Sequence, residues 1–164
     1  MNHNSIRLYP DWIPVIENEP TKENFAKVHL PEFEWCILSK THFTPGEVIA
    51  HIYGGIIKRK SELHTVQKSR DVHIYDEWFA GLVAHSCDPN TYFDDKAETF
   101  VATKEINPGD MITCDYQATE DYLARPFECK CGAENCRGLI DGRLAHQSHT
   151  QPVQARAETE AESQ

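Results

Sequence analysis

The sequence lacks any apolar run long enough to cross a membrane, and its first ten residues lack the apolar stretch of a secretory signal peptide. Basic residues are in the minority, because 16 Lys and Arg face 26 Asp and Glu, for a formal net charge of −10. This balance disfavours direct contact with a nucleic-acid backbone and fits a basic partner better, although acidity of this size also serves solubility alone. We therefore expect a soluble intracellular protein, cytoplasmic or nuclear, that binds neither membrane nor nucleic acid.

Cysteine is scarce in this chain except near its C-terminal end. Three of the six cysteines, Cys129, Cys131 and Cys136, lie within eight residues. Tetrahedral zinc takes four soft ligands, and this cluster supplies three of them. Disulfides are the alternative, but no secretory signal precedes the cluster and cysteines in a C-x-C pattern rarely pair with each other. We predict a zinc site.

The fourth zinc ligand has three candidates in the sequence. Cys36 and Cys114 lie in apolar or alternating segments of strand type, where a free cysteine usually packs as a small hydrophobic residue. Cys87 lies in H-S-C-D-P-N, where Asp, Pro and Asn favour an irregular turn that leaves its side chain free to face another segment. Cys87 is therefore the predicted fourth ligand.

The remaining segments indicate one domain that is mainly β. Residues 1–24 carry three prolines and predict an extended N-terminal arm, and residues 144–164 have almost nothing to bury and predict a disordered tail. Two stretches, 60–70 and 119–124, have helix-forming composition. Alternating or β-branched segments predict strands at 35–38, 47–53, 56–58, 72–75, 91–93, 99–103 and 111–116.

Four motifs, taken in order, resemble a SET domain followed by a post-SET segment. They are F-T-P-G-E-V-I-A-H-I-Y-G at 43–54, A-H-S-C-D-P-N at 84–90, I-T-C-D-Y at 112–116 and C-K-C-G-A-E-N-C-R-G at 129–138. The resemblance covers about residues 33–142 and includes no pre-SET region. It divides the chain into a SET domain at 25–126 and a post-SET zinc segment at 127–143, between the arm and the tail.

This resemblance implies a fold of several small sheets with short helices, in which a pseudoknot threads the C-terminal segment beneath a loop. It also implies S-adenosylmethionine-dependent methylation of a protein lysine, on a basic substrate such as a histone. In families with a post-SET segment the cysteine of the H-S-C motif joins three post-SET cysteines, which agrees with zinc bound by Cys87, Cys129, Cys131 and Cys136.

The site residues follow from the same motifs. Tyr116 of the D-Y motif would orient the substrate amine and is the expected catalytic residue. His85, with Ser86 beside it, carries over from the H-S motif as a cofactor contact. The other expected contacts are Trp35, by stacking, Ala84, where the family has asparagine, and Phe127 and Lys130, where the post-SET segment covers the adenine.

Several positions depart from the family pattern, and most lie on the cofactor side. Glu34 and Cys36 replace two glycines, and their side chains are expected to intrude on the cofactor. Ala84 replaces a hydrogen-bonding asparagine, Gly81 an arginine and Gly55 a glutamate. Three interpretations remain open: a protein-lysine methyltransferase, a SET-derived enzyme for a small amine or another reaction, and a non-catalytic interaction module.

Overall fold

Short strands separated by tight turns build most of the computed structural model, which describes residues 6–145. Within residues 6–145 the bounded helical elements are a 3-10 turn, η2 (Ala80–Leu82), and one short α-helix, α1 (Tyr116–Thr119), and residues 143–145 are helical too. The strands are β1 (Phe25–Leu30), β2 (Glu34–Ser39), β3 (Val48–His51), β4 (Ile57–Lys58), β5 (Thr65–Ser69), β6 (Val72–Tyr75), β7 (Ala84–His85), β8 (Thr91–Asp94), β9 (Thr99–Ala102), β10 (Thr113–Cys114), β11 (Phe127–Glu128) and β12 (Leu139–Ile140).

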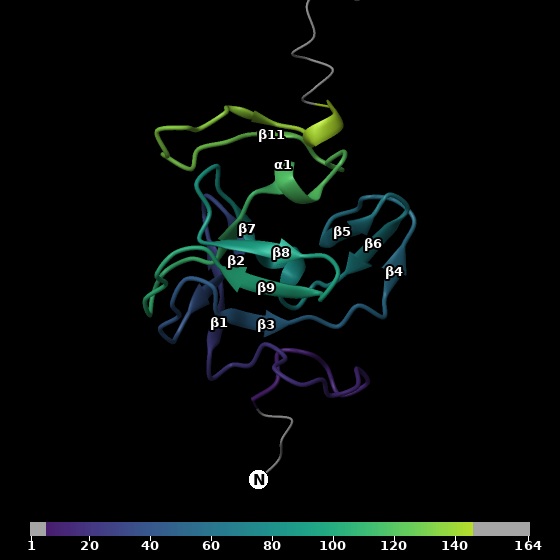
Figure 1. Cartoon of the computed structure of the whole chain (residues 1–164), viewed down its shortest axis with the longest axis vertical. Helices are drawn as coiled ribbons and strands as arrows, with labels where there is room; N and C mark the ends of the chain where they lie inside the picture. The colour runs from purple at the N-terminus through teal and green to yellow at the C-terminus, as the bar shows by residue number, and fades with distance from the viewer. Residues whose placement is uncertain (1–5, 146–164) are drawn as a thin grey trace, which may run out of the picture.

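Within the described residues these strands form five small sheets, as the predicted fold class requires (Figure 1). Two antiparallel sheets have three strands each, in the orders β3-β9-β8 and β4-β6-β5. The pairs β1-β2 and β11-β12 are antiparallel hairpin-like ribbons, and β7 pairs with β10 in parallel. The parallel pair sets Cys114 beside His85, so Tyr116, two residues later, begins α1 next to the H-S-C segment.

The core lies around β9, the middle strand of its sheet. All four residues of β9 are buried, and the ring of Phe100 packs 5.2 Å from that of Phe93 and 5.7 Å from that of Phe79, between centroids. Burial of one such ring contributes about 1.5–3 kcal/mol. The same buried cluster includes Val83, just before the H-S-C motif, and Cys114 of the D-Y motif.

The prediction of an extended N-terminal arm is wrong for residues 6–24. Tyr9 and Ile13 are buried, and the hydroxyl of Tyr9 donates to Asp76 Oδ2 at 2.6 Å. Arg7 Nε donates to Glu19 Oε2 at 2.9 Å, and both side chains are buried. Proline spacing suggested an arm, but the apolar residues between the prolines pack against the sheets.

The helix predicted at 60–70 is also wrong, because residues 65–69 form β5 against β6. Val66 and Gln67 are buried in that pairing, so tertiary contacts override a polar, helix-forming composition. The second predicted helix, at 119–124, begins and ends earlier, since Asp115 rather than Thr119 caps it: Asp115 accepts from the amide of Gln117 at 3.0 Å. The predicted tail from 146 onward lies outside the described residues.

The post-SET segment lies over α1 at one end of the molecule, and the N-terminal segment lies at the other (Figure 1). The two strands of the post-SET segment, β11 and β12, pair Phe127 with Ile140. No helix within residues 6–145 has the length and apolar character that a membrane crossing needs.

Candidate active site and metal centre

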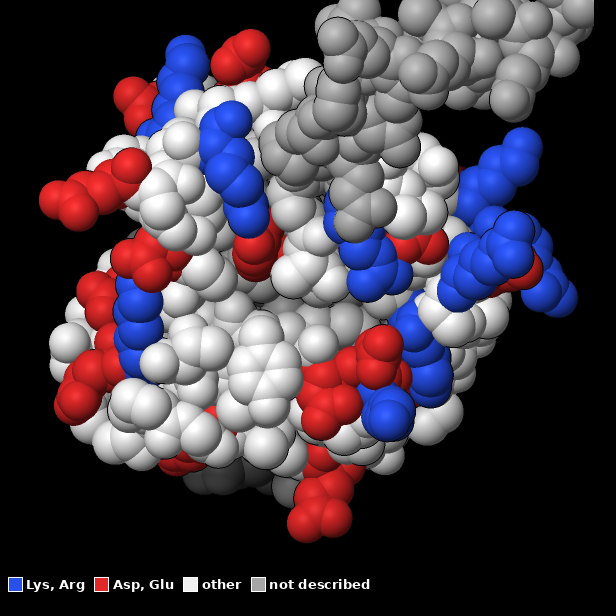
Figure 2. Space-filling view, turned by 45° about the horizontal axis from the view of Figure 1, so that its top comes forward, with Lys and Arg blue, Asp and Glu red and all other residues white. Residues whose placement is uncertain are grey.

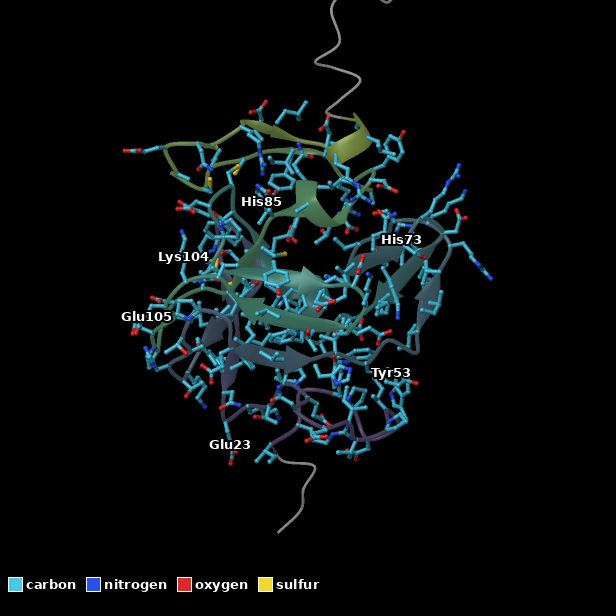
Figure 3. The ribbon with its side chains drawn as sticks, in the orientation of Figure 1. Glu23, Tyr53, His73, His85, Lys104 and Glu105 are labelled. Carbon is cyan, nitrogen blue, oxygen red and sulfur yellow. The ribbon has the colours of Figure 1, made fainter. Side chains whose placement is uncertain are left out.

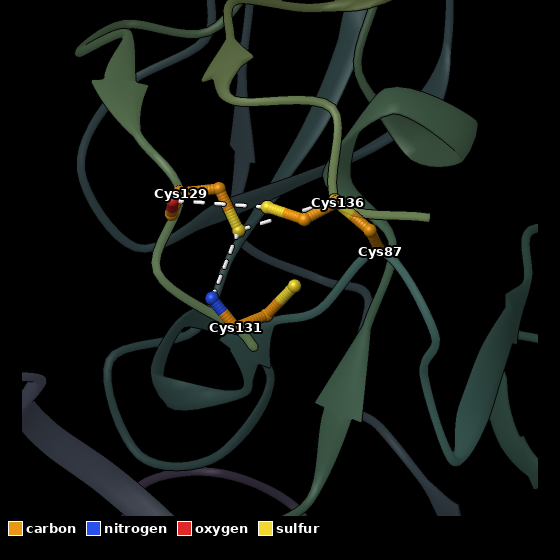
Figure 4. Close-up of side chains that lie close together, drawn as sticks. All are labelled: Cys87, Cys129, Cys131 and Cys136. Carbon is orange, nitrogen blue, oxygen red and sulfur yellow. Dashed lines mark hydrogen bonds between the residues drawn. The ribbon is translucent and has the colours of Figure 1, made fainter. Parts of the chain in front are cut away.

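Four cysteine thiols form a metal-binding group at the C-terminal end of the fold. The sulfur atoms of Cys87, Cys129, Cys131 and Cys136 all lie within 4.8 Å of one another, and those of Cys87 and Cys129 are 3.9 Å apart (Figure 4). A zinc ion with bonds of about 2.3 Å to four sulfurs in a tetrahedron separates them by about 3.8 Å. The described donors therefore fit zinc, and they come from the four cysteines that the sequence singled out.

Hydrogen bonds from the backbone and from side chains connect the cysteines of this group to one another and to neighbouring residues. The amides of Cys131 and Arg137 donate to the sulfurs of Cys129 and Cys87, each at 3.4 Å. The side-chain amide of Asn135 donates to the carbonyl of Cys87 at 3.0 Å. Amide donors favour the thiolate form, which is the form that binds metal.

The other two cysteines lie in the core. Cys36 in β2 and Cys114 in β10 are buried, and burial raises the pKa of both thiols. All six cysteines are free thiols in the structure, which gives no support to the disulfide alternative. The assignment of these two residues as small hydrophobic packing residues is confirmed.

A cavity of about 560 Å³, here called the larger cavity, lies between the β1-β2 turn, the H-S-C segment and the post-SET segment. Its volume is within the range of small-molecule sites. The five residues predicted to contact a cofactor all line it: Trp35, Ala84, His85, Phe127 and Lys130. Tyr116, the predicted catalytic residue, lines it as well. Residues from four separate segments of the sequence therefore line one cavity.

His85 and Tyr116 are held together by directed hydrogen bonds. The amide of Tyr116 donates to His85 Nδ1 at 3.0 Å, so this nitrogen is unprotonated and Nε2, 3.4 Å from the sulfur of Cys87, carries the hydrogen. Burial lowers the pKa of His85 to about 4, while Asp115 raises it and Arg137 lowers it further. His85 is thus neutral at pH 7, and its 3.8 Å approach to Asp115 is not an ion pair.

The hydroxyl of Tyr116 is neutral and points to a backbone oxygen. It donates to the carbonyl of Val83 at 2.5 Å, and burial raises its pKa. Because its hydrogen is used there, the oxygen keeps its lone pairs for another donor. In Figure 3, His85 lies beside α1, the helix that begins at Tyr116.

The expected intrusion by Glu34 and Cys36 is only half correct. Cys36 points into the core and is not among the residues that line the larger cavity. Glu34 lines the cavity and has φ of +57°, a left-handed conformation that favours glycine, so a glutamate occupies a glycine-type backbone position. Trp35 follows it, half exposed, with Lys27 Nζ 4.9 Å from its ring centroid.

Gly81 has no room for the side chain that the family pattern leads one to expect. A Cβ there would lie 2.4 Å from the carbonyl oxygen of Asp76 and 2.5 Å from His64 Cα. His64 has φ of +70°, and its Nδ1 is 3.2 Å from the carbonyl oxygen of Gly81. The segment before β5 therefore fills the space that an arginine side chain would need.

A second cavity of about 220 Å³, here called the smaller cavity, lies beneath α1 and β5. Its lining includes Val66, Phe100, Cys114, Leu123, Tyr116 and Glu120. Six residues line both cavities, so the two meet at a common wall: Leu63, His64, Gly81, Tyr116, Arg125 and Phe127.

Several of these residues were not found from the sequence. His64 and Glu120 lie in segments expected to be helical, and no motif marks either of them. Conversely, Ser86 is outside both linings and its hydroxyl accepts from the amide of Asp88 at 3.1 Å.

Comparison with known proteins agrees with this geometry. The family model described as SET domain matches residues 34–117, just over half of the chain. Histone-lysine N-methyltransferase Set2 of Drosophila melanogaster is 30% identical over 141 residues, which are 71% of this chain and 6% of that protein. Methyltransferase flvH of Aspergillus flavus is 38% identical over 101 residues, which are 59% of this chain and 56% of that protein.

Solved structures show the same fold. KRYPTONITE in complex with mCHH DNA, an H3(1-15) peptide and SAH matches with a TM-score of 0.55 and 21% identity, over 71% of this chain and 29% of that one. The chain thus spans only part of the relatives and structures that it matches. With the family model covering the segment from Glu34 to Gln117, which contains the H-S-C and D-Y motifs, the chain belongs to the SET-domain family.

Proposed function

We propose that this protein is an S-adenosylmethionine-dependent N-methyltransferase. One observation carries the proposal: Tyr116 lies in the wall shared by two cavities, the larger one lined by all five predicted cofactor contacts. A methyl donor in the larger cavity and an amine in the smaller one would meet at this wall. Relatives that share the SET domain are named histone-lysine N-methyltransferases or methyltransferase, and a structural neighbour holds SAH.

S-adenosylmethionine supplies a methyl group on a sulfonium, which a neutral amine displaces in line. The protein then has to align the nitrogen and keep water away. The lone pairs of the Tyr116 hydroxyl oxygen, left free by its bond to Val83, can accept an N–H of the amine.

Zinc, in this proposal, acts through structure. Cys129 and Cys131 would bind the metal, and with Lys130 between them they line the larger cavity. A metal that closes the cysteine group therefore holds part of the cavity wall in place.

For the substrate we propose a lysine side chain of a basic protein or peptide, such as a histone, because relatives carry that name and one structural neighbour holds an H3 peptide. Charge alone does not single out a peptide: acidic and basic side chains alternate over the face drawn in Figure 2.

A small amine is the second candidate, and the build of one segment favours it. Between Tyr53 and His85 the chain forms only three short strands and one 3-10 turn, which offers little surface for an extended peptide.

The test is calorimetric titration of the zinc-loaded protein with S-adenosylhomocysteine, followed by transfer of labelled methyl from S-adenosylmethionine. Two acceptors, an H3(1-15) peptide and n-butylamine, separate the two substrate classes. We expect micromolar binding and transfer to at least one acceptor. Failure to bind S-adenosylhomocysteine would favour the interaction-module interpretation and contradict the proposal.

Tyr116→Phe provides the variant that tests the role of the hydroxyl. We expect it to bind S-adenosylhomocysteine as the unchanged protein does but to transfer methyl about 100-fold more slowly, as removal of one positioned polar group commonly does. Tyr122→Phe is the matched control, since Tyr122 is 59% exposed and lines neither cavity. Equal rates for both variants would remove Tyr116 from the catalytic step.

A further inference from the structure

Apolar residues form much of the lining of the smaller cavity, and Glu120 is its one buried carboxylate; Glu62, His64 and Arg125 also line it. Glu120 is 6% exposed and lines the cavity together with Val66, Phe100 and Leu123. Its Oε2 accepts from the amide of Gln67 at 2.9 Å. Among the described residues no Lys, Arg or His forms an ion pair with it.

A buried carboxylate without a cationic partner is costly unless something else neutralises it. The charged and titratable groups around Glu120 do not do so. Asp121 disfavours its ionised form, the side chain of Thr119 favours it through a hydrogen bond, and Arg143, which also favours it, directs its guanidinium to Asp121 instead. The net effect, mainly from burial, raises the pKa of Glu120 to about 7.

The position of Glu120 is fixed by its neighbours rather than by chance packing. Its amide donates to the carbonyl of Tyr116 at 2.9 Å and closes α1. The side chain of Gln67 bonds Asp121 at both ends, accepting from the Asp121 amide at 2.7 Å and donating to its Oδ2 at 2.7 Å. Gln67 of β5 thus holds the 120–121 segment against the cavity.

We propose that Glu120 is the specificity residue that binds the positively charged alkyl amine of the substrate in the smaller cavity. The apolar walls suit the alkyl chain and the carboxylate suits its ammonium group, which is the usual composition of a small-molecule site. This inference rests on the proposed N-methyltransferase function and names the group that recognises its acceptor.

The same environment accommodates the change of charge that transfer requires. Because Glu120 takes up a proton more readily than an exposed glutamate, a proton can move from the bound nitrogen to a carboxylate oxygen. An N–H bond breaks, an O–H bond forms and the nitrogen keeps its lone pair. The neutral amine that results is the form able to attack a methyl group.

The experiment compares n-butylamine with the neutral n-butanol, titrated into zinc-loaded protein with and without S-adenosylhomocysteine. Glu120→Gln is the test variant, because its amide oxygen can still accept from Gln67. We expect it to bind n-butylamine about 10-fold or more weakly, the effect of one charge-assisted hydrogen bond, and to bind n-butanol as the unchanged protein does. Asp95→Asn is the matched control: it removes an exposed carboxylate that lines neither cavity, and should change the affinity less than about twofold.

Each outcome separates the two claims. The affinity for S-adenosylhomocysteine, measured on every variant, reports whether the larger cavity is folded. If the unchanged protein does not bind S-adenosylhomocysteine, the proposed function is contradicted. The assignment of Glu120 is overturned by either of two results in a protein that binds S-adenosylhomocysteine. One is that Glu120→Gln binds n-butylamine as tightly as the unchanged protein does; the other is that the unchanged protein does not bind n-butylamine. An H3(1-15) peptide, titrated in parallel, shows whether the amine recognised in this way belongs to a lysine side chain.

Discussion

The core strand β9 and the post-SET segment differ in what stabilises them. All four residues of β9 are buried between β3 and β8, whereas no residue from 127 to 139 is buried. The first region is stabilised by apolar burial, which is spread over many contacts. The second depends on four thiols and a few directed hydrogen bonds. One chain therefore combines a region that many substitutions weaken slightly with one that loss of a single ion would release.

Removing the metal should produce the largest difference between the two regions. Structural zinc binds peptides with about 10–16 kcal/mol of apparent free energy, so its loss should free residues 127–140 and leave β9 folded. Hydrogen exchange is the measurement: the amide of Cys129, which donates to the carbonyl of Gly138 at 2.7 Å, should lose protection while that of Phe100 keeps it. Cys136→Ser should reproduce the pattern and Cys36→Ala should not. Equal loss in both regions would mean that the segment has no separate stability.

Phe100→Ala tests the other side of the comparison. Truncation of a fully buried phenylalanine should lower the free energy of unfolding by about 3–5 kcal/mol, measured by urea titration. Protection should then fall throughout the core rather than in one segment. Tyr92→Ala, a half-exposed ring on β8, serves as control with an expected cost below about 1 kcal/mol. A small effect at Phe100 would show that the core repacks.

Glu120, which lies outside both regions, makes the stability of the protein depend on pH. Its pKa, 4.5 ordinarily and about 7 here, means that the folded state favours the protonated form. The stability this provides is complete below pH 4.5 and is lost as pH rises through 7, by at most about 3 kcal/mol. The midpoint temperature of thermal unfolding, measured from pH 4.5 to 8, should therefore fall more steeply with pH for the unchanged protein than for Glu120→Gln. Parallel curves would mean that the carboxyl is better solvated than its burial indicates.

Glu34→Gly should produce the smallest effect and the opposite sign. The left-handed backbone at Glu34 costs about 1 kcal/mol for a residue with a side chain, so glycine should raise the thermal midpoint. Glu32→Gly, in the same turn but outside the left-handed region, should lower it. If Glu34→Gly destabilises instead, the glutamate side chain makes contacts that outweigh the strain.

Local signals predicted the parts of the fold that local chemistry decides. The Pro-Gly pairs at 45–46 and 108–109 both form tight turns, with Gly46 and Gly109 at φ of +90° and +95°. The irregular turn at Cys87 does present its thiol to the distant cysteines. The strand at β5 was mistaken for a helix, because its partner β6 rather than its own composition determines its conformation.

The candidate site was predictable only where a motif marks it. The cysteines and Tyr116 stand in recognisable motifs, whereas His64 and Glu120 become neighbours of Tyr116 through the packing of β5 against the 120–121 segment. Glu120 looks like one of many surface acids in the sequence, and only its burial distinguishes it. Burial of a single polar residue depends on contacts far along the chain, which no local pattern records.

The parallel pairing of β7 with β10 has a consequence for the order in which the molecule forms. His85 meets Tyr116 across 31 residues, and Cys87 meets Cys129 across 42. Contacts of such separation form slowly, because long loops must close first. During synthesis the ribosome will have released the β3-β9-β8 sheet before the last cysteine emerges, so a nascent chain has a folded core well before it has a binding site.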